Sequence, residues 1–322
     1  MNSNRAVLEV LKWCSASDLL LNLSQVCLFY SSLSNQPEVW FELLGADYSY
    51  HSDLSPKQQY RFVATQYIPV VSSDSLRKFY VHTQSWQSLP LSETVRVHRF
   101  MCTALTRLGQ VFVTGTPSTP DTFQIHSISG LVTFLDSLIT HRNSMGVIRY
   151  QDDIYALAGY SGSGYHNECE VYMYKTAKWR KLPNCLNARS AATPAAHNAK
   201  IYLLGGCGTI TAEYLHTTTE TFHLLPMELP DCYCTIALCT DTELRAVQEL
   251  GFYSCNIENP PNYWEITRFP FDFGIAFWSD CPVFCSNGDY YIHQNYRSRV
   301  IVLNLQKMTF TEFPTNVQPL ES

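Results

Sequence analysis

Six apolar residues, which we call the anchors, recur along this 322-residue chain at nearly constant spacing. A period of 40 to 50 residues is typical of repeat architectures, in which one supersecondary unit recurs along the chain. Most anchors are followed at a fixed offset by an apolar residue and a proline, as Leu182-Pro183 follows Trp179. The sequence therefore predicts six equivalent units. Their anchors, 46, 47, 43, 42 and 46 residues apart, are Trp86, Val132, Trp179, Phe222, Trp264 and Phe310.

The sequence between the anchors has the pattern of four short strands per unit. Residues 198–206, NAKIYLLGG, give a polar turn, an apolar strand and a glycine pair, and residues 152–160, DDIYALAGY, repeat the pattern. Residues 168–183, ECEVYMYKTAKWRKLP, give a strand, a turn and the strand that carries Trp179, and residues 299–314 copy them. Apolar and β-branched runs separated by turn residues are typical of antiparallel strands.

These segments resemble the kelch repeat. Its pattern runs from an apolar strand ending in Gly-Gly, through a strand of the V-E-V-Y type, to W-x-x-L-P. The resemblance extends over residues 60–314 and implies a mainly β fold, a six-bladed kelch-type β-propeller at residues 60–316. In such a ring, aromatic side chains fill the wedges between neighbouring blades. Two ways of closing the ring stay open: blades made of consecutive strands, or closure by the segment from Tyr60 to Thr65.

The N-terminal part has a different periodicity. Apolar residues at helical three- and four-residue steps predict a small three-helix module at residues 5–46, followed by a linker at residues 47–59. Asn35-Gln36-Pro37 interrupts the pattern before a last short helix that carries Trp40. The apolar positions are Val7, Leu8, Leu11, Leu19, Leu20, Leu23 and Val26.

This module resembles an F-box in its latter half. Val26-Cys27 is followed by Tyr30, by Trp40 ten residues later and by Leu43, although the usual opening Leu-Pro is missing. The resemblance implies that the F-box-like module binds the small adaptor of SCF-type ubiquitin ligases. The residues expected to form its small core and its adaptor surface are Leu8, Leu11, Leu19, Val26, Tyr30 and Trp40.

Composition excludes several classes of partner. The formal net charge of -6 is spread without long runs, so no basic patch for nucleic acid is expected. No apolar run reaches the roughly 18 residues that a membrane span needs. Arg5, Glu9 and Lys12 interrupt the apolar core that a secretory signal would require. We therefore expect a cytoplasmic protein, with a nuclear or cytoskeletal location also open.

Candidate catalytic and metal-binding residues do not form known motifs. The 12 cysteines include no C-x-x-C pair, which favours buried free thiols over zinc ligands or disulfides. The 10 histidines contain no H-x-x-x-H or H-E-x-x-H arrangement. The segment 161–166, SGSGYH, is similar to a nucleophile elbow but lies between two expected strands, so a hairpin tip is favoured. No enzyme activity, metal or cofactor is predicted.

An arginine lies ten residues beyond each of the first three anchors, where the chain enters the next blade. Arg96, Arg142 and Arg189 are therefore expected near the ring axis, with His98, Arg99, His141 and Asn143 close by. Two interpretations stay open. The guanidinium groups bind the carboxylates or phosphates of an acidic partner peptide, or they brace neighbouring loops.

Together these features predict a non-catalytic binding protein. The F-box and kelch resemblances imply a substrate-recognition subunit of an SCF-type E3 ubiquitin ligase, with the adaptor on the helices and the target protein on the propeller. The alternative is a structural or scaffold subunit of a large assembly, for example a cytoskeletal one, that uses both modules for docking.

Overall fold

The computed structural model of this chain describes only part of the sequence. The described residues are 67–81, 84–97, 101–106, 110–115, 121–127, 129–231, 235–248, 251–261, 263–270, 283–286, 289–294 and 299–314. The predicted F-box-like module and the linker lie outside them. All regular elements of the described part are β-strands, so it offers no helix that could cross a membrane.

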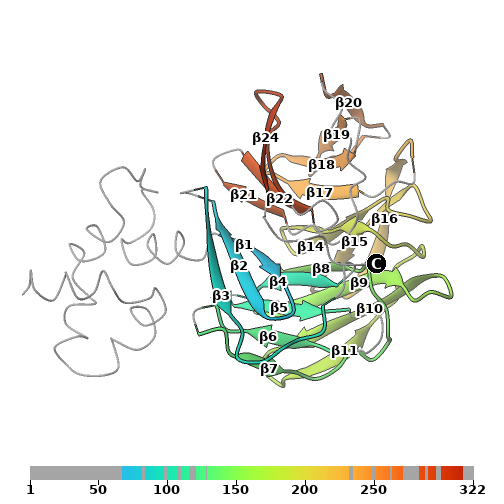
Figure 1. Cartoon of the computed structure of the whole chain (residues 1–322). Helices are drawn as coiled ribbons and strands as arrows, with labels where there is room; N and C mark the ends of the chain where they lie inside the picture. Colours follow the sequence, from blue (N-terminus) through green and yellow to red (C-terminus); the bar gives the residue numbers. More distant parts are fainter. Residues whose placement is uncertain are drawn as a thin grey trace, which may run out of the picture. The chain divides into compact units, whose positions relative to one another are not determined.

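The strands form six sheets, each a blade of a β-propeller (Figure 1). All six sheets lie within the predicted range of residues 60–316. Blade 1 contains β1 (Tyr67–Val71), β2 (Ser75–Tyr80) and β3 (Ser85–Pro90). Blade 2 contains β4 (Cys102–Leu105), β5 (Val111–Thr114), β6 (Phe123–Ile125) and β7 (Val132–Phe134). Blade 3 contains β8 (Gly146–Tyr150), β9 (Asp153–Tyr160), β10 (Tyr165–Met173) and β11 (Lys178–Leu182).

The remaining blades follow the same order. Blade 4 contains β13 (Ala195–His197), β14 (Lys200–Leu204), β15 (Thr211–His216) and β16 (Thr221–Glu228). Blade 5 contains β17 (Thr235–Cys239), β18 (Glu243–Gln248), β19 (Gly251–Asn256) and β20 (Glu265–Arg268), and β12 (Ala192–Thr193) pairs in parallel with β17. Blade 6 contains β21 (Val283–Ser286), β22 (Asp289–Gln294), β23 (Arg299–Asn304) and β24 (Thr309–Pro314). Apart from β12, each described sheet is built from consecutive strands.

Five of the six anchors lie on the last strand of their blades. In four blades the anchor faces the residue seven positions earlier: Ile125 faces Val132, Tyr172 faces Trp179, Leu215 faces Phe222 and Leu303 faces Phe310. A constant separation means that the hairpins before these anchors have one length. Trp264 directly precedes β20 after a longer hairpin.

Burial of the anchors is uneven. Val132, Trp179 and Trp264 are buried. Trp86, Phe222 and Phe310 are half-buried. Phe222 and Phe310 pack against the apolar clusters of their blades while part of each ring stays exposed. The prediction that the aromatic anchors are largely buried is therefore confirmed for Trp179 and Trp264.

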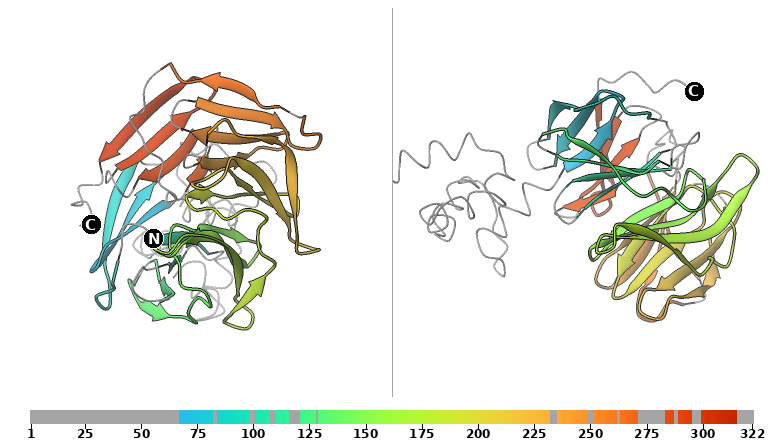
Figure 2. Two further views of the ribbon diagram at one scale, coloured as in Figure 1. Left: turned by 90° about the vertical axis from the view of Figure 1, so that its right-hand side faces the viewer. Right: turned by 90° about the horizontal axis from the view of Figure 1, so that it is seen from below.

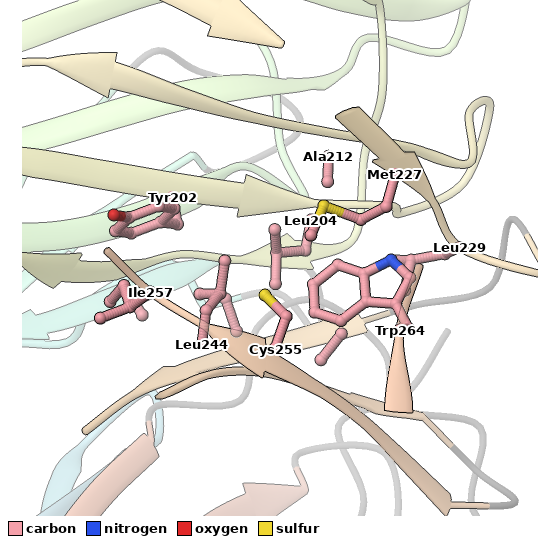
Figure 3. Packing of buried hydrophobic residues seen from close by; sticks show 12 residues of the cluster. Tyr202, Leu204, Ala212, Met227, Leu229, Leu244, Cys255, Ile257 and Trp264 are labelled. Atoms are coloured by element: carbon pink, nitrogen blue, oxygen red, sulfur yellow. The ribbon is translucent and has the colours of Figure 1, made fainter. Parts of the chain in front are cut away.

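Apolar clusters fill the wedges between adjacent blades, as the repeat pattern predicts. Figure 3 shows the cluster between blades 4 and 5, in which Leu204 and Met227 of blade 4 meet Leu244, Cys255 and Trp264 of blade 5. Similar clusters join blades 2 and 3, blades 3 and 4, and blades 5 and 6. This burial of apolar surface holds the small sheets together, because a single blade cannot cover both of its faces.

Aromatic contacts join the last blade to the first. The ring of Phe79 on β2 lies 5.1 Å from that of Phe313 on β24 and 6.4 Å from that of Tyr291 on β22, between centroids. In Figure 2, left, blade 1 (blue) lies next to blade 6 (red). In the described residues, side-chain packing therefore joins blades 1 and 6, and the segment from Tyr60 to Thr65 lies outside them.

Six cysteines whose side chains the structure describes are free thiols, and the predicted burial is confirmed for four of them. Cys102, Cys169, Cys185 and Cys255 are buried, and Cys207 and Cys239 are partly exposed. Burial raises the pKa of Cys239 to about 12 and that of Cys255 to about 11, so both are protonated at neutral pH. The part of the chain that the structure describes holds no group of three or more residues suited to a metal ion.

Candidate protein-binding surface

Loops of two kinds emerge at one end of each blade. Because antiparallel strands alternate in direction, the loop between the second and third strands leaves at the same end as the loop that leads to the next blade. In blades 3 and 4 this end is formed by residues 135–145, 160–168, 183–190 and 205–211. We call these four segments the loop face.

Arg142 of the loop face is fully buried and forms an ion pair with Glu170 of β10, at 2.5 Å. Its Nε donates to the carbonyl oxygen of Ala158 at 2.7 Å, and its terminal nitrogens donate to the carbonyl oxygens of Thr140 at 2.9 Å and Ala156 at 3.3 Å. The guanidinium therefore joins the loop that enters blade 3 to the second and third strands of that blade.

Arg189 repeats this arrangement in blade 4. It forms an ion pair with Glu213 of β15, and neither side chain is exposed. Its terminal nitrogens donate to the carbonyl oxygen of Gly205 at 2.8 Å and to both the carbonyl oxygen and the hydroxyl of Thr211, at 2.9 and 2.8 Å. Both arginines therefore donate their hydrogen bonds to groups inside the protein. This is the bracing role, one of the two interpretations that the sequence left open.

The two glutamates were missed in the sequence, although a signal was present. Glu170 lies nine residues before Trp179, and Glu213 lies nine residues before Phe222. In unit 2 the same position, nine residues before Val132, is Phe123, which is buried and carries no charge.

Arg96 differs from the other two arginines for this reason. It lies in the loop that leads into blade 2, where Phe123 stands at the position of the two glutamates. Arg96 is exposed and forms no ion pair with any residue in the described part. Of the three arginines in register, Arg96 alone is exposed to a partner.

The other predicted site residues fall into two groups. His98 and Arg99 lie outside the described residues. His141 is exposed, and Asn143 is half-buried. The backbone of Asn143 pairs with Tyr160 through two hydrogen bonds of 2.8 Å, which attaches this loop to the end of β9. The Asn143 Oδ1 atom is buried without a hydrogen-bond partner.

Two aliphatic side chains that the sequence did not single out project from equivalent positions of the loop face. Ile139 is 50% exposed and Leu186 is 49% exposed. The backbone N–H of Ile139 donates to Glu170 Oε2 at 2.8 Å, and that of Leu186 donates to Glu213 Oε2 at 2.7 Å. The buried carboxylates thus fix the backbone of both loops, and the apolar side chains remain in solvent.

Two tyrosines flank the tip of the β9–β10 hairpin, between these loops. The rings of Tyr160 and Tyr165 lie 5.8 Å apart, and they are 37% and 49% exposed. The tip joins two strands, which confirms the predicted hairpin. Tyr165 also packs against Gly208 in blade 4, where a Cβ atom would lie 2.7 Å from the ring.

Comparison with known proteins identifies the repeat. The family model described as Kelch motif matches residues 141–186, which include Arg142, Glu170, Trp179 and Leu186. The motif and the six-blade propeller together support a kelch-repeat protein. Kelch-like protein 40 of Xenopus laevis is 30% identical over 94 residues, a stretch that spans 29% of this chain and 14% of that relative. This kelch propeller suggests protein–protein interaction, for which loops on a rigid scaffold are suited.

Proposed function

We propose that this chain is the substrate-recognition subunit of an SCF-type E3 ubiquitin ligase. In this proposal the F-box-like module at residues 5–46 binds the ligase adaptor, and the kelch propeller binds the target protein. The chain itself is not an enzyme and needs no cofactor, because ubiquitin transfer takes place on other subunits.

One observation carries the propeller's part of this proposal. The loop face presents four large apolar or aromatic side chains, Ile139, Tyr160, Tyr165 and Leu186, on a backbone fixed by buried ion pairs. Exposed apolar groups gathered on one face mark interaction sites. A fixed backbone lowers the entropy lost on binding.

The adaptor part rests on the sequence alone. Its support is the spacing of Val26, Tyr30, Trp40 and Leu43. We further propose that the protein acts in the cytoplasm, where the ligase is assembled, with nuclear and cytoskeletal sites as variants of the same function.

Affinity purification of the full chain, followed by mass spectrometry, tests the proposal. Recovery of the adaptor and a cullin in amounts comparable to the bait supports the ligase. Recovery of abundant assembly subunits without adaptor or cullin contradicts it and favours the scaffold role, in which both modules are docking surfaces.

A further inference from the structure

We propose that the loop face binds a partner segment in which apolar or aromatic side chains lie beside a basic residue. This inference rests on the proposed function in one respect, namely that the propeller is the part that binds the target. It replaces the sequence-based prediction that the three arginines bind an acidic or phosphorylated peptide.

The four segments of the loop face offer no accessible lysine or arginine side chain. Its four segments contain no lysine, and their two arginines are Arg142 and Arg189. Both have no exposed side-chain surface, and each is neutralised by its own glutamate. An acidic ligand would therefore meet no accessible cation from these residues, and breaking a buried pair to free one would be costly.

The accessible charge on this surface has the opposite sign. The side chain of Glu168 is 36% exposed, and its Oε2 lies 2.8 Å from Nδ1 of His166. A carboxylate is ionised at neutral pH. Lysine or arginine on a partner can approach its exposed edge, and such charge-assisted hydrogen bonds are stronger than neutral ones.

The apolar side chains belong to neighbouring loops that contact one another. Asn143 pairs with Tyr160, whose ring lies against Tyr165, and Tyr165 reaches Gly208. The next loop joins them where Asn184 Nδ2 donates to Asn167 Oδ1 at 3.2 Å. These contacts link blades 3 and 4 at this end, so one partner segment can touch several of the loops.

Tyrosine and leucine side chains suit this role for a physical reason. A tyrosine ring offers a large apolar area and a polar tip while losing little conformational freedom when it is fixed. Apolar side chains of the partner can cover Ile139, Leu186 and the two tyrosine rings, while a basic residue reaches Glu168. Apolar contact then supplies affinity, and the charge supplies selectivity.

A random 12-residue phage-displayed peptide library, selected on the immobilised full chain, provides the probe. We expect the enriched peptides to combine Leu, Ile, Phe, Tyr or Trp with at least one Lys or Arg. A synthetic version of the most enriched peptide is then measured by fluorescence anisotropy against the variants. The double variant Y165S/L186S should weaken binding about tenfold or more, the size expected for central apolar contacts.

Leu224 provides the matched control. It is 56% exposed but lies on the outer strand β16, away from the loop face, so L224S should leave the dissociation constant within about twofold. The variant E168Q should reduce the advantage of the basic peptide over the same peptide with its Lys or Arg replaced by Ala. Equal melting temperatures of the variants would show that the fold is retained.

Three outcomes would overturn the inference. They are enrichment of Asp- and Glu-rich peptides, a library from which no peptide is enriched, and binding that is lost in R96A but retained in Y165S/L186S. None of these measurements uses the adaptor. Failure here beside normal adaptor recovery would leave the ligase proposal intact, and loss of adaptor recovery alone would leave this inference intact.

Discussion

Arg142 and Glu170 form an ion pair that is closed to solvent on both sides, and the pair connects the loop entering blade 3 to that blade's third strand. The same connection recurs in blade 4 through Arg189 and Glu213. Each glutamate also accepts a backbone N–H from the loop, from Ile139 in one case and from Leu186 in the other. These pairs shape the loops that carry the exposed apolar side chains.

Loss of either residue of such an ion pair should therefore destabilise the blade as well as the loop. We expect R142A and E170Q each to lower the free energy of unfolding by about 3 to 5 kcal/mol, because a buried charge is left without its counterion. R96A, at the exposed equivalent position, should change it by no more than about 0.5 kcal/mol. Urea unfolding followed by tryptophan fluorescence measures all three. Equal effects of R96A and R142A would show that burial does not separate their roles.

Truncation of Trp179 should be among the most damaging core changes. Its ring lies 5.5 Å from that of Tyr172 and 6.0 Å from that of Phe112 in blade 2, and its Nε1 donates to the carbonyl oxygen of Asp136 at 2.9 Å. We expect W179A to cost about 3 to 5 kcal/mol. The exposed L224A serves as control in the same unfolding assay. A cost for W179A as small as that of the control would contradict its role in joining blades 2 and 3.

Lys78 should give the protein a measurable pH dependence. It is buried on β2, its Nζ donates to the carbonyl oxygen of Ser127 at 2.8 Å, and burial lowers its pKa from 10.5 to about 8. Between pH 8 and 10.5 the unfolded chain therefore holds a proton that the folded protein has lost. Deprotonation stabilises the folded state over this window, and the unfavourable burial of the charge is fully present below pH 8.

The variant K78M isolates this contribution. The stability of the natural protein relative to K78M should rise by up to about 3 kcal/mol from pH 7.5 to 10.5, since each pH unit contributes about 1.4 kcal/mol. Thiols and tyrosines titrate in the same range in both proteins, so their contributions cancel in the difference. A difference that is flat with pH would mean that Lys78 keeps an ordinary pKa.

The adaptor proposal predicts a selective loss of binding. Charged substitutions of Leu19 and Val26, such as L19E and V26E, should abolish recovery of the adaptor from cell extracts, because a charge in an apolar interface is costly to desolvate. The propeller should keep its melting transition, which circular dichroism follows. Full adaptor recovery with both variants would place the scaffold role ahead.

Much of the architecture could be predicted from the sequence. The spacing from Trp86 to Phe310 gave six units with the correct anchors, since each blade must place one large apolar group in the same wedge. The hairpin tip at residues 161–164 was also predictable, because turn residues between two strand patterns leave few alternatives. The burial of Trp86, Phe222 and Phe310 was overestimated, because each ring keeps part of its surface exposed.

The role of each arginine, bracing or accessible, could not be predicted from the local sequence pattern. Arg96, Arg142 and Arg189 share one offset from their anchors, yet one is exposed and two are buried. The difference comes from residues 24 to 28 positions away, Phe123 in one blade and Glu170 and Glu213 in the others. Sequence periodicity thus determined the number and order of the blades. Only the tertiary structure decided which arginines remain accessible. An arginine is buried and neutralised where the fold brings a carboxylate from a distant strand against it.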